Sequence, residues 1–129
     1  MATKKIDVRK EVLKYLEDNK IIGKRLYIVP IQKIVTINKR GIKHVVSKKY
    51  GENKHQEIRL RLLKNIPKIL SESYYMGFDK NTKSPNQVLG VHNFYAITVY
   101  NKKMYEVWLK VKETRDLTFV YDMGIIREI

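Results

Sequence analysis

Hydrophobic residues in the first half of the chain recur at the spacing of an amphipathic helix. Three helices are therefore predicted, at about residues 7–19, 38–50 and 54–71. Asn38 or Thr36 is suited to cap the second of them, because a short polar side chain can accept a hydrogen bond from a free amide of the first turn. Pro67 lies inside the third segment and has no amide hydrogen, so the helix must kink there or begin a new turn.

Two short apolar runs rich in β-branched residues lie between the first and second helices. Residues 25–30 and 33–37 are predicted to be strands, at an edge of a sheet because Pro30 interrupts them. Residues 74–78 form a further candidate strand. The segment that follows, DKNTKSPNQ, has the Asp, Asn, Ser and Pro content that is typical of a loop.

The second half of the chain alternates apolar and polar residues from position 89 to 122, as half-buried strands do. Turn signals at residues 101–103 and 115–116 divide it into three strands. Residues 123–129 either add a last strand or pack back. The prediction is an α+β fold in which N-terminal helices are followed by an antiparallel β-meander. At 129 residues the chain is most simply a single domain.

The length of the first turn decides which side chains share a face of the meander. A three-residue turn gives an apolar face of Tyr105, Val107, Leu109 and Val111, opposite Val99, Ile97, Tyr95 and Asn93. The other face, left open, then carries His92, Phe94, Ala96 and Thr98 beside Glu106, Trp108, Lys110, Lys112 and Thr114. A two-residue second turn adds Phe119 and Tyr121 to this open face, next to its lysines.

A two-residue first turn is the alternative register. It pairs His92 with Val111, and it pairs Phe94 with Leu109. Because both partners are apolar, His92 would then move towards the core. The open basic and aromatic face therefore depends on the three-residue turn, which is the register that the sequence prediction adopts.

The charge balance of the chain indicates a polyanionic partner. Lys and Arg number 27 against 13 Asp and Glu, which gives a formal net charge of +14. Nucleic acid is the commonest partner of so basic a domain, and an anionic membrane surface or an acidic protein are the rivals. With 43% hydrophobic residues, the chain is not a disordered basic tail.

Several function classes are disfavoured by what the sequence lacks. There is no cysteine, which excludes disulfides and thiol chemistry, and three histidines are too few to predict a metal site. No phosphate-binding glycine loop or serine-nucleophile motif occurs, and no cofactor is expected. No apolar segment follows MATKKIDVRK, and none approaches the length of a membrane span. The expectation is a soluble, cytoplasmic protein.

The open face of the meander has a composition suited to RNA or another single-stranded nucleic acid. Lysines neutralise phosphates, and aromatic rings stack on unpaired bases. An ordinary solvated sheet face is the alternative. On the second helix, His44 is expected on the polar side, with Arg40 and Lys48. The residues predicted to bind nucleic acid are Arg40, Lys48, Phe94, Trp108, Lys112 and Phe119.

The order of these segments resembles a known family. KIVTINKRGIKHVVSKKYG, then RLLKNIPKILSESYYMG, then a polar loop, then HNFYAITVYNKKMYEVWLKVKE and FVYD are similar to the phage-associated nuclease domains of the barnase, EndoU, colicin and RelE-like group. The resemblance covers residues 33–122, which it implies are a nuclease core. Residues 1–32 then form an N-terminal helix and strand, and residues 123–129 form a C-terminal end.

The resemblance implies a metal-independent endoribonuclease in which a 2′-hydroxyl attacks the adjacent phosphate. Many members of the group are toxins, so an acidic antitoxin or immunity protein is implied as a partner beside RNA. The histidine of the GIKH motif is His44, and the matching positions on the sheet are His92, Lys110 and Tyr121.

The residues present agree with that chemistry. The reaction needs a base for the 2′-hydroxyl, an acid for the 5′-oxygen and a cation for the phosphorane. His44 and His92 are expected to divide the base and acid roles, Lys110 to stabilise the phosphate, and Tyr121 or Thr114 to position it. The alternative function is a non-catalytic basic module, from a phage or mobile-element system, that binds nucleic acid or a protein partner.

Overall fold

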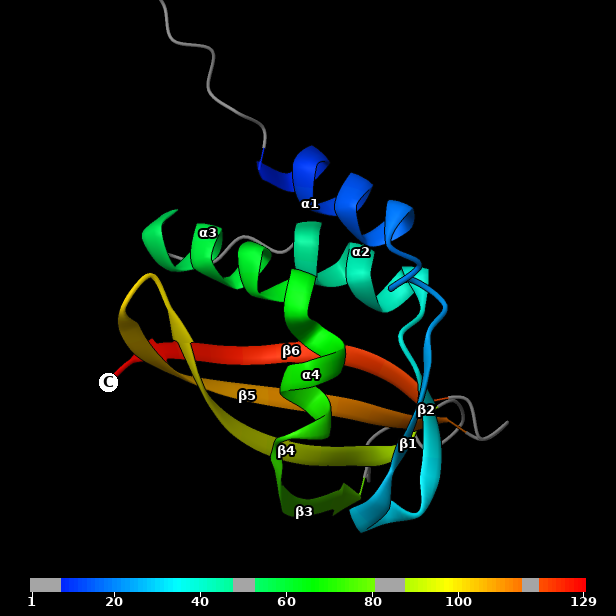
Figure 1. Ribbon diagram of the computed structural model, residues 1–129. Helices are drawn as coiled ribbons and strands as arrows, with labels where there is room; N and C mark the ends of the chain where they lie inside the picture. Colours follow the sequence, from blue (N-terminus) through cyan, green and yellow to red (C-terminus); the bar gives the residue numbers. More distant parts are fainter. Residues whose placement is uncertain (1–7, 48–52, 81–87, 115–118) are drawn as a thin grey trace, which may run out of the picture.

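The computed structural model describes residues 8–47, 53–80, 88–114 and 119–129, and at positions 44, 47, 53–56 and 119–126 it describes the backbone alone. Helices come first and a long antiparallel meander follows, as predicted (Figure 1). The α+β fold class is therefore confirmed.

The helices lie where the hydrophobic spacing places them. They are α1 (Val8–Asp18), α2 (Lys39–Ser47), α3 (Asn53–Leu62) and α4 (Ile66–Ser71), with a 3₁₀ turn at Leu63–Asn65. Asn38 caps α2, since its Oδ1 accepts a hydrogen bond of 2.7 Å from the Gly41 amide. Pro67 lies at the start of α4, so the predicted third helix is divided before it, as its missing amide requires.

Six strands form one sheet in the order β1-β2-β6-β5-β4-β3. Their bounds are β1 Arg25–Ile28, β2 Lys33–Thr36, β3 Tyr74–Lys80, β4 Val88–Tyr100, β5 Lys103–Thr114 and β6 Phe119–Glu128. The strands from β3 to β6 form the antiparallel meander. The β1–β2 hairpin joins it through one parallel pair, Thr36 with Val120.

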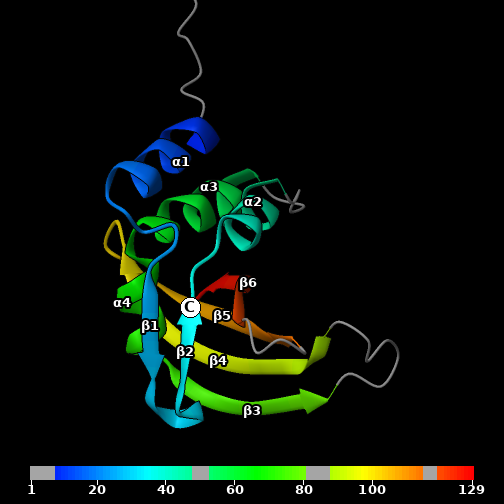
Figure 2. The same cartoon turned by 90° about the vertical axis from the view of Figure 1, so that its right-hand side faces the viewer.

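The helices of the described chain cover one side of the meander and leave the other side open (Figures 1 and 2). The buried core lies between the two layers. From the helices it takes residues such as Leu16, Ile42 and Leu70, and from the sheet it takes alternate residues of β4 and β5. We call the two sides of the sheet the helix side and the outward side.

The first hairpin adopts the two-residue turn, so the register adopted from the sequence is wrong. Tyr100 pairs with Lys103, and both turn residues have positive φ, 51° at Asn101 and 65° at Lys102. Positive φ at both positions is the signature of a type I′ turn, whose twist matches that of the flanking strands.

The corrected register moves two predicted site residues into the interior. His92 pairs with Val111, and Phe94 pairs with Leu109. Phe94 is completely buried, so it is a core residue and not a stacking platform for bases. The β5 half of the prediction is confirmed, because Tyr105, Val107, Leu109 and Val111 are all buried.

The second hairpin is also shifted from its predicted register. A two-residue turn at residues 115–116 was expected to bring Phe119 and Tyr121 next to Lys112 and Lys110, which requires Phe119 to pair with Lys112 and Tyr121 with Lys110. The ladder instead pairs Phe119 with Glu113 and Tyr121 with Val111. The observed pairing is shifted by one residue from the predicted one. The turn itself, residues 115–118, lies outside the described residues.

Candidate functional site

Three polar side chains from adjacent strands meet on the helix side of the sheet. The Tyr75 hydroxyl of β3 lies 3.0 Å from Nδ1 of His92 on β4. Oε2 of Glu113 on β5 lies 3.6 Å from Nε2 of the same imidazole. We call Tyr75, His92 and Glu113 the histidine cluster. His92 is only 8% exposed, so its contacts define its chemistry more than solvent does.

Strand pairing explains why these side chains converge. Glu113 pairs with Gly90, which is two residues before His92, so both side chains lie on one side of the sheet. A bulge in β3 just after Tyr75 shifts the pairing by one residue and lets Phe78 pair with His92. The Phe78 and His92 ring centroids are 4.7 Å apart. A Cβ at Gly90 would collide with the Phe78 ring, so glycine permits this packing.

Burial lowers the pKa of His92, and it outweighs the opposing effect of the Glu113 carboxylate. The positive charge of Lys33, at the start of β2, lowers the pKa further. The ring is therefore neutral near pH 7. A carboxylate can only accept, so we assign the ring proton to Nε2, facing Glu113, and Nδ1 accepts from the Tyr75 hydroxyl.

The cluster thus has the order of a proton relay: a hydroxyl, an imidazole that can take its proton, and a carboxylate that orients the imidazole. Burial raises the pKa of Tyr75, with a smaller contribution from the charge of Glu113. Tyr75 therefore keeps its proton near pH 7. The 3.6 Å gap to Glu113 is longer than a hydrogen bond, and such contacts commonly tighten only when substrate binds.

The lowered pKa of His92 predicts a pH-dependent stability. The unfolded chain binds a proton at His92 near pH 6.5, above the folded pKa, so protonation favours unfolding. The contribution of neutral His92 to the free energy of unfolding is fully present above about pH 6.5, and it is lost as the pH falls through the pKa of His92 in the folded state. Urea denaturation at pH 7.5 and pH 5 should show this loss. A His92→Gln variant should lose less stability over the same interval, and an equal loss would contradict the assignment.

Lys110 is not brought to this cluster. It pairs with Asn93 and lies on the outward side, so the sheet itself separates it from His92. The predicted set of His92 and Lys110 in one site is therefore wrong, because it followed from the wrong first turn. Thr114 pairs with Val88 at the end of β5, and Arg40 is exposed on α2.

The remaining predicted residues are placed in part. His44 belongs to α2, and Phe119 and Tyr121 belong to β6, but their side chains lie outside the described residues. Lys48 lies outside the described residues altogether. Their roles stay predictions.

The described part of the chain has neither a metal-ion cluster nor a helix suited to cross a membrane. Within it, no three His, Asp or Glu side chains come together in a way that would hold a metal ion. None of its helices combines the length and the apolar character that crossing a lipid bilayer requires.

Comparison with known proteins adds one match. Residues 3–121 match the family model of large polyvalent protein-associated domain 3. The chain belongs to this family. No curated protein and no solved structure matches the chain.

The outward side of this polyvalent protein-associated domain has an aromatic pair of its own. The rings of Tyr95 and Trp108 lie 4.9 Å apart between centroids. Tyr95 donates a hydrogen bond of 2.9 Å to Glu106, which also accepts a hydrogen bond of 2.6 Å from Arg127. Trp108 and Lys110 were expected on an open face, and β5 does carry both outward. The basic and aromatic character of the whole outward side stays a prediction, because the side chains at positions 119–126 lie outside the described residues.

Three residues of the domain's site were missed by sequence reasoning. Glu113 could have been found with the two-residue turn, because His92 then pairs with Val111 and Glu113 lies two residues further along β5, on the same side of the sheet. Tyr75 has no such signal, since nothing in the local pattern fixes how β3 pairs. The charge of Lys33 lowers the pKa of His92 although the two residues are distant in the sequence. The strand that carries Lys33 was predicted, but its position in the sheet was not.

Proposed function

We propose that this domain is a metal-independent endoribonuclease of toxin type, from a phage or mobile-element system, and that the histidine cluster is its catalytic centre. The observation that carries the proposal is the contact order Tyr75–His92–Glu113, with 3.0 Å and 3.6 Å between the successive groups. The net charge of +14 supports a polyanionic substrate. The family assignment is compatible with it but names no activity.

In the proposed reaction the RNA 2′-oxygen attacks the adjacent phosphorus, and the bond from phosphorus to the 5′-oxygen breaks. The 2′-hydroxyl gives its proton to the Tyr75 oxygen as the Tyr75 proton passes to Nδ1 of His92. The Glu113 carboxylate then stabilises the imidazolium. The products are a 2′,3′-cyclic phosphate and a free 5′-hydroxyl, so no water is consumed in this step.

Two further groups complete the proposal. Lys33 replaces Lys110 as the cation near the phosphorane, because its charge acts on His92 from the start of β2. The leaving 5′-oxygen needs a proton, and His44 on α2 is proposed as the acid that supplies it.

The test is incubation of the purified chain with labelled RNA in excess EDTA. The proposal predicts cleavage that EDTA leaves unchanged and products that end in a 2′,3′-cyclic phosphate. A phosphatase that does not open the cyclic ester provides the end-group control. Intact RNA, or cleavage that EDTA abolishes, would overturn the proposal.

A non-catalytic nucleic-acid-binding module is the second candidate. The observation that favours it is the Tyr95 and Trp108 ring pair on the outward side, where β5 carries Lys110 and Lys112 after Trp108. Half-buried aromatic rings such as these, beside lysines, can stack bases and neutralise phosphates without any acid–base group. This surface is separated from His92 by the sheet, so the two candidates use different residues.

A Lys110→Ala, Lys112→Ala double variant tests the outward surface. Each phosphate contact that is lost should reduce the salt dependence of RNA affinity by about one unit of slope in log K against log [salt]. The double variant is therefore expected to bind more weakly at low salt and with a slope lower by about two. A Lys24→Ala, Lys68→Ala variant is the control for net charge. Unchanged affinity and slope in the Lys110, Lys112 variant would argue against this surface.

A further inference from the structure

One end of β4 extends past its neighbour β3, so the backbone of that end forms an unpaired edge of the sheet. β3 pairs with β4 only as far as Tyr74 with Tyr95, whereas β4 continues to Tyr100. Among the described residues, no strand pairs with this last part of β4 on the β3 side. An unpaired edge of this kind is a template for strand addition.

The first hairpin determines which backbone groups face that edge. In a two-residue turn the closing pair, here Tyr100 and Lys103, exchanges both backbone hydrogen bonds. Successive residues direct their N–H and C=O groups to opposite neighbours, so those of Ile97 and Val99 point away from β5. These two residues are also 50% and 66% exposed.

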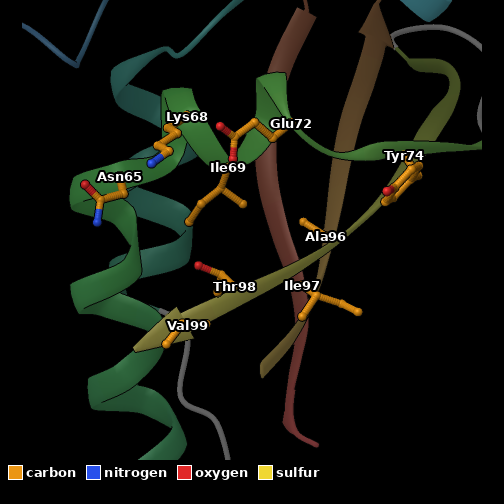
Figure 3. A pocket seen from close by; sticks show the side chains of 9 residues that line it. All are labelled: Asn65, Lys68, Ile69, Glu72, Tyr74, Ala96, Ile97, Thr98 and Val99. Carbon is orange, nitrogen blue, oxygen red and sulfur yellow. The ribbon is translucent and has the colours of Figure 1, made fainter. Parts of the chain in front are cut away.

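A cavity of about 520 Å³ lies beside this edge, between α4 and β4 (Figure 3). On the α4 side it is lined by Lys68, Ile69 and Glu72, and on the sheet side by Ile97 and Val99. Tyr74, the first residue of β3, is 70% exposed and lies where the pairing of β3 with β4 stops and the free edge of β4 begins. The cavity beside the edge can therefore receive side chains of an added strand, and that strand would cover the exposed side chains of Ile97 and Val99.

Charge distinguishes the two kinds of chain that could add here. A second copy would bring another net charge of +14 to the same edge, and the two copies would repel each other. An acidic segment would be attracted by the net charge of the domain, and in the cavity Lys68 offers it a cation, which faces the opposing carboxylate of Glu72. The apolar residues of the edge favour a segment with apolar side chains at alternate positions.

We infer that the β4 edge, residues 96–100, is a docking site for an acidic polypeptide that adds as an extended strand beside Ile97 and Val99. The backbone supplies the pairing, and the cavity between α4 and β4 receives alternate side chains. His92 lies nearer the other end of β4, so occupancy of this edge leaves the histidine cluster uncovered. The inference does not depend on RNA cleavage.

The probe is a seven-residue peptide of alternating Glu and Val with blocked ends, added to the ¹⁵N-labelled chain. Binding should shift the amide resonances of Ile97 and Val99 and protect these two amides from hydrogen exchange. A peptide of alternating Lys and Val is the charge control, and it should bind much more weakly. Absent binding, protection at other strands, or equal binding of the Lys peptide would overturn the inference.

An Ile97→Pro variant removes the edge N–H without removing a hydrogen bond to β5, because that N–H points away from β5. The Glu and Val peptide should lose affinity by about tenfold, the effect of one lost hydrogen bond. An Ile97→Thr variant keeps the N–H, and its affinity for the Glu and Val peptide should fall far less. Sedimentation of the parent provides the remaining test, since a dimer that Ile97→Pro dissociates would show a second copy at this edge and overturn the acidic partner.

Discussion

Replacement of His92 by glutamine is expected to lower the rate of RNA cleavage by about 10²- to 10⁴-fold. Glutamine can still accept a hydrogen bond from Tyr75 and donate one to Glu113, but it cannot take up a proton at neutral pH. The loss therefore isolates proton transfer from packing. The measurement is a single-turnover rate with labelled RNA in EDTA.

Thermal unfolding of the variant at pH 7.5 is the control for this result, because the parent ring is neutral there and its replacement should disturb the fold little. Glu113→Gln is the second variant. It removes the charge that stabilises the imidazolium, and a smaller loss of rate is expected. Cleavage at the parent rate by His92→Gln would exclude the histidine cluster as the catalytic centre.

Replacement of Phe94 by alanine is expected to lower the free energy of unfolding by about 3–5 kcal/mol. Phe94 is completely buried and packs against Tyr75, with 5.3 Å between the ring centroids, so truncation leaves a cavity that the core cannot easily fill. Urea denaturation measures the change. Ile97→Ala is the matched control on the same strand, and since Ile97 is exposed it should change stability by no more than about 0.5 kcal/mol.

The same variant distinguishes the two registers of the first hairpin. With the three-residue turn, Phe94 would lie on the open face, and its truncation would weaken RNA binding with little effect on stability. With the observed two-residue turn, stability falls and the effect on RNA follows only from unfolding. A stable Phe94→Ala variant with weakened RNA binding would contradict the structure.

The helical half of the fold is predictable because its signals are local. Asn38 caps a helix by accepting from an amide three residues away, and Pro67 begins one because it lacks an amide hydrogen. Neither feature depends on how distant segments pack. The approximate bounds of the strands follow from alternation in the same way.

The register of the first hairpin was the step that local reasoning missed. Asn101 commonly adopts positive φ, but the residue after it in a type I′ turn is usually glycine, and here it is Lys102. The chain adopts the strained turn because the two-residue register buries Phe94 and the apolar side of β5 together. Tertiary burial thus outweighs the local preference of one lysine.

Local sequence signals predict the candidate site even less well than they predict the register of the first hairpin. The Tyr75 hydroxyl bonds to a residue 17 positions away, and the bulge after Tyr75 decides which side of the sheet its neighbours occupy. A bulge has no reliable sequence signal here. His92 could be selected as a candidate by residue type alone, whereas its partners required the strand pairing.

Removal of the Tyr75 hydroxyl tests the proton relay most directly. Tyr75→Phe keeps the ring that packs against His92 and Phe94 and deletes only the group that donates to Nδ1. Tyr74→Phe is the matched control, because Tyr74 is the adjacent residue and is largely exposed. In EDTA, the parent and Tyr74→Phe are predicted to release 2′,3′-cyclic phosphate ends at the same rate, with Tyr75→Phe slower by about 10²-fold or more. Equal rates for Tyr75→Phe and the parent, or no cleavage by the parent, would contradict the account.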